Sequence, residues 1–190
     1  MLDSILPYEL IFVQKVSPMF NDAFDFALIY KFFSDPSEKT QRIKYIIRAE
    51  IHEDVIAIKF YAARDRKLDD KYNRILNTYG YRGALKIFIT CAYVVPKLMD
   101  LYPNSSFVIN GASTIDIHRN KKEDHNTNQR FRIYRSLASK IIGDSLFEHY
   151  QFKEVSSYLL VRKEEGIDIC DKKDRIRSLL IDRYDVQNIL

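Results

Sequence analysis

The sequence predicts an α+β fold, a mixed but mostly antiparallel sheet flanked by helices, with a further helix at the C-terminus. Two observations support this class. Across residues 8–63, apolar side chains recur at every second position in four successive segments, which is the period of strands with one buried face. Beyond these segments, the period changes to that of amphipathic helices, which alternate with two short strands. A meander followed by alternating helices and strands is typical of helices packed on a mixed sheet.

Four strands are expected in the first third of the chain. A loop rich in turn-forming residues, SDPSEKTQ at 34–41, separates the second strand from the third. The polar HED at 52–54 separates the third strand from the fourth, so these two strands are expected to form a hairpin. The four expected strands cover residues 8–12, 24–32, 43–51 and 56–62.

The rest of the chain is expected to alternate helices with strands. Pro96 lies inside the long apolar run that follows Gly83, and it is expected to kink that helix or to mark its last turns. Asp171 is the expected N-cap of the last helix, and residues 113–129 form a long polar insertion. The expected helices cover residues 66–80, 83–99, 130–150 and 171–190, and the expected strands cover 106–111 and 153–163.

The expected organisation is one α+β domain over residues 1–165, followed by a helical appendage over residues 166–190. A chain of 190 residues suits one domain, and no linker or internal repeat divides it. The appendage carries an amphipathic pattern, so we expect it to pack on its own domain or against a partner.

Composition and charge favour a cytoplasmic protein without a membrane anchor. The two cysteines, Cys91 and Cys170, do not indicate a disulfide framework, so a reducing compartment is expected. The first residues lack the features of a signal peptide. The longest apolar run, 84–99, contains Lys86 and Lys97 and is shorter than the roughly 20 residues that span a bilayer. The net charge of +4 permits a nucleic-acid partner without requiring one.

Three stretches resemble motifs of the GNAT superfamily, the fold of many acyl-CoA-dependent N-acetyltransferases. YGYRGA at 79–84 leads into the central helix, where that family binds the pyrophosphate of its cofactor. NTNQRFRIY at 126–134 is similar to the start of the family's second helix, and YQFKEVSSYLLVRK at 150–163 is similar to its closing strand. The resemblance spans residues 40–163 and is closest to uncharacterised GNAT-like proteins of bacteria.

The resemblance implies acetyl-CoA as the cofactor and an amine as the acceptor. Tyr134 would be the general acid that protonates the departing thiolate. Glu53, at the hairpin turn beside His52, is the candidate general base. The implied cofactor-binding residues are Tyr81, Arg82, Gly83, Ala84, Asn126 and Asn128.

The same residues also have structural interpretations. Gly80 and Gly83 permit a positive φ in a tight connection. Tyr134 shares a helical stripe with Phe131 and Leu137, which is typical of core packing. In addition, the glycine spacing departs from the family's pattern. The alternative function is therefore a non-catalytic GNAT-fold interaction protein, acting through protein or nucleic-acid contacts.

A basic stretch and the polar insertion suggest two further kinds of site. Basic residues interleaved with Phe131 and Tyr134 are compatible with a nucleic-acid backbone and stacked bases. His118 and His125 are of a type that binds metals, but their polar context favours a solvated loop, so no metal site is predicted. The basic residues of this stretch are Arg119, Lys121, Lys122, Arg130, Arg132 and Arg135.

Overall fold

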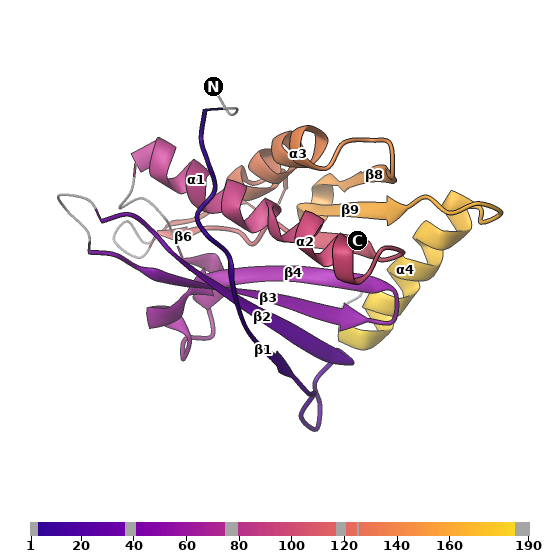
Figure 1. Ribbon diagram of the computed structural model, residues 1–190, viewed down its shortest axis with the longest axis horizontal. Helices are drawn as coiled ribbons and strands as arrows, with labels where there is room; N and C mark the ends of the chain where they lie inside the picture. The colour runs from indigo at the N-terminus through magenta and orange to yellow at the C-terminus, as the bar shows by residue number, and fades with distance from the viewer. Residues whose placement is uncertain (1–3, 37–40, 75–79, 117–120, 125, 185–190) are drawn as a thin grey trace.

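A seven-stranded mixed sheet forms the centre of the molecule (Figure 1). The computed structural model describes residues 4–36, 41–74, 80–116, 121–124 and 126–184. The strand order is β1-β2-β3-β4-β5-β9-β8. β4 and β5 run parallel, whereas the other neighbouring strands run antiparallel, which confirms the predicted α+β class. The strands are β1 Ile11–Val16, β2 Phe26–Phe33, β3 Lys44–His52, β4 Val55–Ala62, β5 Ser106–Asn110, β8 Phe147–Phe152 and β9 Ser157–Arg162.

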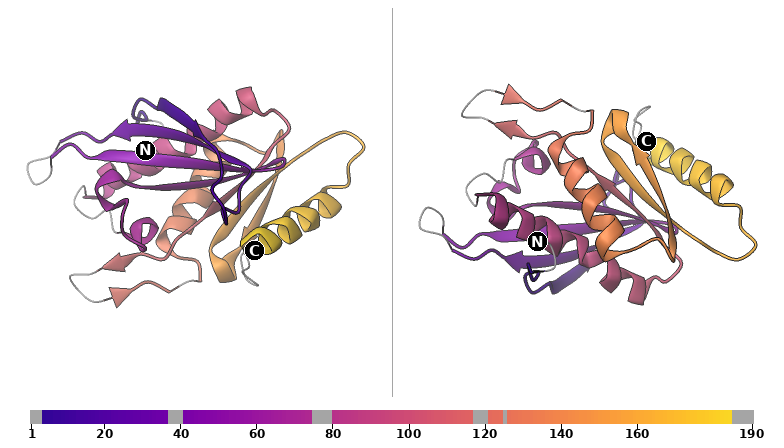
Figure 2. Two further views of the ribbon diagram at one scale, coloured as in Figure 1. Left: turned by 90° about the horizontal axis from the view of Figure 1, so that it is seen from below. Right: turned by 90° about the horizontal axis from the view of Figure 1, so that it is seen from above.

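Helices cover both faces of the sheet (Figure 2). One face carries α1, α2 and α3, and the other carries the C-terminal helix α4. No helix of the described residues is long and apolar enough to cross a membrane. The remaining elements are α1 Gly80–Ala92, α2 Val94–Leu101, α3 Gln129–Ile141, α4 Ile169–Tyr184, the hairpin strands β6 Ile115–Asp116 and β7 Lys121–Lys122, and the 3-10 turns η1 Ala63–Asp65, η2 Lys71–Asn73 and η4 Lys153–Val155.

Alternating side chains of the central strands supply two hydrophobic cores. On β4, Ile58 and Phe60 pack toward α1, α2 and α3, whereas Ala57 packs toward α4. β5 and β9 alternate in the same way, because strands buried on both faces carry apolar residues at nearly every position. Ile176 and Leu180 of α4 complete the second core. The C-terminal helix therefore packs on its own domain.

The long apolar run after Gly83 forms two helices. α1 ends at Ala92 and α2 begins at Val94, so the break falls at Tyr93. Pro96 explains this position, because it has no N–H to donate to the carbonyl of Ala92 and its ring clashes with that carbonyl. The structure confirms that Pro96 interrupts the predicted helix. The break falls at Tyr93, about one turn before the proline itself.

Two helices predicted from periodicity are wrong in part. Of the helix predicted over 66–80, the described residues 66–74 contain only the short turn η2, and the helix predicted over 130–150 ends at Ile141. Gly143 has a φ of +71°, and its amide and that of Ile142 both donate to the carbonyl of Ala138. Glycine adopts this left-handed conformation at little cost, so it ends the helix. The chain then forms β8, which pairs with β9 along its whole length.

Smaller differences concern the ends of elements. Asp168, rather than Asp171, caps α4, because its Oδ1 accepts hydrogen bonds from the amides of Cys170 and Asp171. The first strand begins at Ile11 and β9 begins at Ser157, later than expected in both cases. The polar insertion contains the β6–β7 hairpin in its described part.

A close approach of backbones joins the end of β5 to the start of α3. Asn128 caps α3: its Oδ1 accepts from the amide of Phe131 at 2.9 Å, and its Nδ2 donates to the carbonyl of Gly111. A Cβ placed on Gly111 would lie 2.8 Å from that Oδ1, 2.9 Å from Phe131 N and 3.0 Å from the oxygen of Ser156. Two of the three contacts are with backbone, so this position requires glycine.

We expect Gly111→Ala to lower the free energy of unfolding by about 3 kcal/mol, because the added methyl overpacks this junction. Urea denaturation measures the loss. Gly143→Ala is the matched control, since a Cβ there meets nothing within 4 Å and the substitution should cost about 1 kcal/mol for its positive φ. Equal losses in the two variants would contradict the packing explanation.

Candidate functional site

β4 and β5 stop pairing halfway along β4. They pair from Val55 with Ser106 to Ile58 with Ile109, and β4 then continues to Ala62 beside β3 alone. We call the region between this part of β4 and the helices α1 and α3 the β4/β5 fork. In the family that the sequence resembles, the central helix follows the meander as α1 follows β4 here. Tyr134 of α3, the expected general acid, also lies in the fork.

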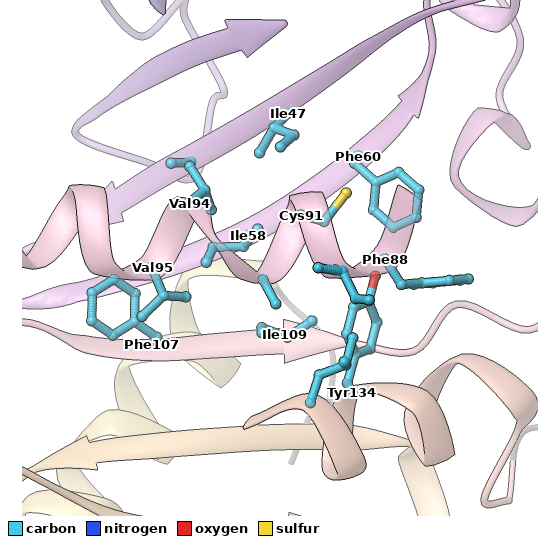
Figure 3. Close-up of a cluster of buried hydrophobic side chains, with 14 of the residues drawn as sticks. Ile47, Ile58, Phe60, Phe88, Cys91, Val94, Val95, Phe107, Ile109 and Tyr134 are labelled. Atoms are coloured by element: carbon cyan, nitrogen blue, oxygen red, sulfur yellow. The ribbon is translucent and has the colours of Figure 1, made fainter. Parts of the chain in front are cut away.

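Aromatic side chains fill the fork (Figure 3). Phe60 of β4 meets Phe88 of α1 edge to face, with ring centroids 5.5 Å apart. Phe88 meets Tyr134 of α3 in the same manner at 5.4 Å. Burial raises the pKa of the Tyr134 hydroxyl, and that of the Cys91 thiol, well above their usual ranges. Tyr134 therefore lies in the core, as its helical stripe indicates.

Arg130 closes the fork on the side of the chain that leads from β4 to α1. Its guanidinium donates hydrogen bonds to the carbonyls of Tyr72 and Arg74, and lies 5.6 Å from the ring centroid of Phe60. Burial lowers its pKa from the usual value. In the sequence, Arg130 belongs to the basic stretch that is compatible with nucleic-acid contact. Its position four residues before Tyr134 was the signal that it faces the core.

The fork does not fit an acyl-CoA thioester in this arrangement. A general acid must come within hydrogen-bond reach of the departing thiolate. The four side chains that line the fork are no more than 6% exposed, so a thioester would have to displace them. They are Phe60, Phe88, Arg130 and Tyr134.

The first turn of α1 is the more accessible part of the predicted cofactor site. Gly80 has a φ of +65°, as expected for a tight connection. The first amides of a helix lack intrahelical partners, and Arg82 lies in this first turn. The side chain of Tyr81 is 70% exposed. Arg82 is also exposed, and its side chain has no hydrogen bond or ion pair within the described residues.

A pocket of about 460 Å³ lies beside this turn. Lys86 lines it, donates to Asp35 at 2.9 Å and lies 4.1 Å from the ring centroid of Tyr8. Since Asp35 neutralises Lys86, Arg82 is the unpaired cation among the described residues that line the pocket. The other lining residues are Ser4, Ile5, Leu6, Pro36 and Gly83.

The two asparagines predicted to bind a cofactor have different surroundings. Asn128 is buried, and its side chain is used in full by the cap on α3 and by Gly111. Asn126 is exposed, and its amide donates to Asp124 at 3.1 Å. Only Asn126 therefore presents a side chain to solvent.

Glu53 lies far from Tyr134. It sits in the β3–β4 turn, and its carboxylate faces Arg175 and Arg183 of α4 at 3.5 and 3.9 Å. Phe60, next to Tyr134 in the fork, is seven positions further along the hairpin, or roughly 20 Å at the rise of a strand. The structure does not bring the predicted acid and base into one site.

A cluster of charged side chains lies under α4, on the opposite face of the sheet. Glu50 is buried and bonds to Arg48 and Lys59, each at 2.6 Å, and Tyr184 donates to it at 2.8 Å. Burial alone would raise the pKa of Glu50, but Lys59, Tyr184 and Arg48 together lower it. The Nε2 of His52 lies 2.8 Å from the same Tyr184 hydroxyl, and burial lowers the pKa of His52. The sequence signal for this cluster was the alternation of Arg48, Glu50 and His52 along one face of a strand.

This cluster anchors the last turn of α4 to the sheet. Its carboxylate and tyrosine oxygen already have partners, so it is a structural network in this arrangement.

No group of three or more metal-ligating side chains occurs among the described residues. His118 and His125 lie outside them. Cys91 and Cys170 are both free thiols.

Comparison with known proteins adds no relative: no family model, curated protein or solved structure matches this chain.

We expect Glu50→Gln to lower the free energy of unfolding at pH 7 by about 1–3 kcal/mol, because Lys59 and Arg48 lose their carboxylate. The folded-state pKa of Glu50 is below its usual value, so its contribution is present above about pH 4.5 and is lost as the pH falls through the folded-state pKa. The difference between wild type and variant should therefore shrink below that pH in urea denaturation.

Glu53→Gln is the control for this prediction, since Glu53 lies on the same hairpin but is exposed. It should change stability by less than about 0.5 kcal/mol. A difference between wild type and Glu50→Gln that stays constant down to pH 3 would contradict the assigned ionisation.

Proposed function

We propose that this chain is a GNAT-like domain that acts as a non-catalytic interaction protein. The observation that carries this proposal is the packing of the β4/β5 fork. Tyr134, the implied general acid, is enclosed by Phe88, and Arg130 is bonded to two backbone carbonyls. An acyl-transfer site would need this space for its thioester.

The order of elements supports the GNAT-like part of the proposal. The meander β1–β4 leads into the central helix, and a parallel strand, a second helix and a closing strand follow. The end of α3 at Ile141 also supports the resemblance, because the chain then turns directly into the hairpin of β8 and β9.

An acyl-CoA-dependent N-acyltransferase is the second candidate. The first turn of α1 favours it, because this turn combines the first amides of a helix with the positive end of its dipole, and the side chain of Arg82 lies beside a pocket and forms no ion pair with any residue that the structure describes. In that case the turn would hold the pyrophosphate of acetyl-CoA, and a deprotonated amine would attack the thioester. The fork would have to open for this reaction.

We expect millimolar acetyl-CoA to leave the melting temperature unchanged, because the fork is filled. A thermal-shift titration measures this. A ligand present at 100 times its Kd would stabilise the fold by about 2.7 kcal/mol.

Stabilisation that is lost in Arg82→Glu and kept in Lys97→Glu would favour the acyltransferase instead. Lys97 is a matched control, because it is exposed on α2, away from the pocket.

A further inference from the structure

Part of the sheet face that carries α4 has no helix over it among the described residues. The second core, which α4 covers, draws its strand residues from β4, β5 and β9. Toward β1, the same face continues with side chains that belong to neither hydrophobic core. The ladder register places them on the face of Ala57 and Glu50, because they alternate with the residues of the first core. Its apolar members include Ile11, Ile29, Phe33 and Ile46, all half-buried, and we call this surface the open face. On its β4 side, η2 covers Tyr61, because the ring of Tyr72 meets that of Tyr61 edge to face with centroids 5.5 Å apart.

The open face carries an excess of positive charge. Glu50 is the acidic residue that β1–β4 place on this side, and Arg48, Lys59 and Tyr184 already bond to its carboxylate. Further cations border the apolar residues and form no ion pair within the described residues. These are Lys31 and Lys44 on the strands and Lys71 on η2.

The dimensions of the open face suit a single helix. The three neighbouring strands β1, β2 and β3, about 4.8 Å apart, span about 10 Å, close to the diameter of one helix with its side chains. The uncovered part of β2, from Ile29 to Phe33, is about 15 Å long, which equals the length of a helix of about 10 residues. α4 covers the adjoining part of the face in this way, with Ile176 and Leu180 against the sheet.

We propose that the open face binds an amphipathic, acidic α-helix of a partner protein. The apolar side of that helix would cover the isoleucines, and its carboxylates would meet Lys31, Lys44 and Lys71. This inference rests on the proposed function, since it names the kind of partner that an interaction protein of this shape would take.

Two other occupants fit the surface less well. The α4 helix of a second copy is itself basic, so the lysines of the open face would repel it; its cations include Lys172, Lys173, Arg175, Arg177 and Arg183.

Single-stranded nucleic acid needs free aromatic rings on which bases stack. Here the centroid of Phe33 has Arg42 at 4.6 Å, that of Tyr61 has Tyr72 at 5.5 Å and Lys71 at 5.9 Å, and the other apolar members of the face are isoleucines.

The test uses a fluorescein-labelled peptide of about 20 residues, with leucines along one face of a helix and glutamates along the other. We expect the full chain to raise its fluorescence anisotropy with a micromolar Kd. Lys31→Glu/Lys44→Glu and, separately, Ile46→Asp should each weaken binding by about tenfold or more. Ile46 lies outside both cores but is half-buried in a central strand, so the urea midpoint of each variant is measured beside its affinity, which separates lost binding from unfolding.

Lys97→Glu/Lys140→Glu is the matched control, because it makes the same change of charge on helices that cover the opposite face. It should keep wild-type affinity. The proposal is overturned by no binding at about 100 micromolar protein, by an equal loss in the control variant, or by equal binding of a peptide with lysines in place of the glutamates. Tighter binding of oligo-dT through the same lysines would also overturn it and assign the face to nucleic acid.

The two proposals fail in different ways. Acetyl-CoA would bind at α1 and the fork, so stabilisation by acetyl-CoA would overturn the proposed non-catalytic function. Peptide binding concerns the opposite face of the sheet and is measured independently.

Discussion

The parallel pairing of β4 with β5 is the contact on which the architecture depends. It extends over four residue pairs, from Val55 with Ser106 to Ile58 with Ile109, and it joins the meander to the closing strands β9 and β8. Both strands are buried on both faces, so each rung of this short ladder contributes side chains to two cores. The helices on the two faces are thereby positioned by the same few residues.

The end of that pairing determines what the protein can do chemically. Beyond Ile58, β4 no longer has β5 as a neighbour. The space beside this part of β4 must hold either a ligand or the protein's own side chains. Phe60, Phe88 and Tyr134 occupy it, and Arg130 ties the chain before α1 to α3 through two carbonyls. A buried guanidinium without hydrogen bonds would be strongly unfavourable, so these carbonyls and Arg130 stabilise the closed fork together. This packing favours an interaction protein over an acyltransferase.

Polar chemistry is concentrated on the other face of the sheet. Glu50 binds Tyr184 and so anchors the last turn of α4, while Arg175 holds the helix to Asp54 with two hydrogen bonds of 2.7 and 2.6 Å. Beyond this helix, Tyr72 of η2 covers Tyr61 of β4, and lysines and isoleucines of β1, β2 and β3 share the rest of the surface without a helix over them among the described residues. A sheet normally buries its apolar residues against another layer, and this is the physical reason for expecting a partner there.

The sequence alone determined the alternating strands β2, β3, β4 and β5 and the buried character of the central helix, because these depend on local periodicity. It also indicated the core position of Tyr134. Only the tertiary structure decided that residues 147–152 form a strand, since their pairing partner β9 lies further along the chain. The surroundings of Arg130 and Glu53 were likewise decided only by the tertiary structure. Whether a charged side chain is enclosed or solvated depends on distant segments, here the carbonyls of Tyr72 and Arg74 and the arginines of α4, which no local pattern brings together.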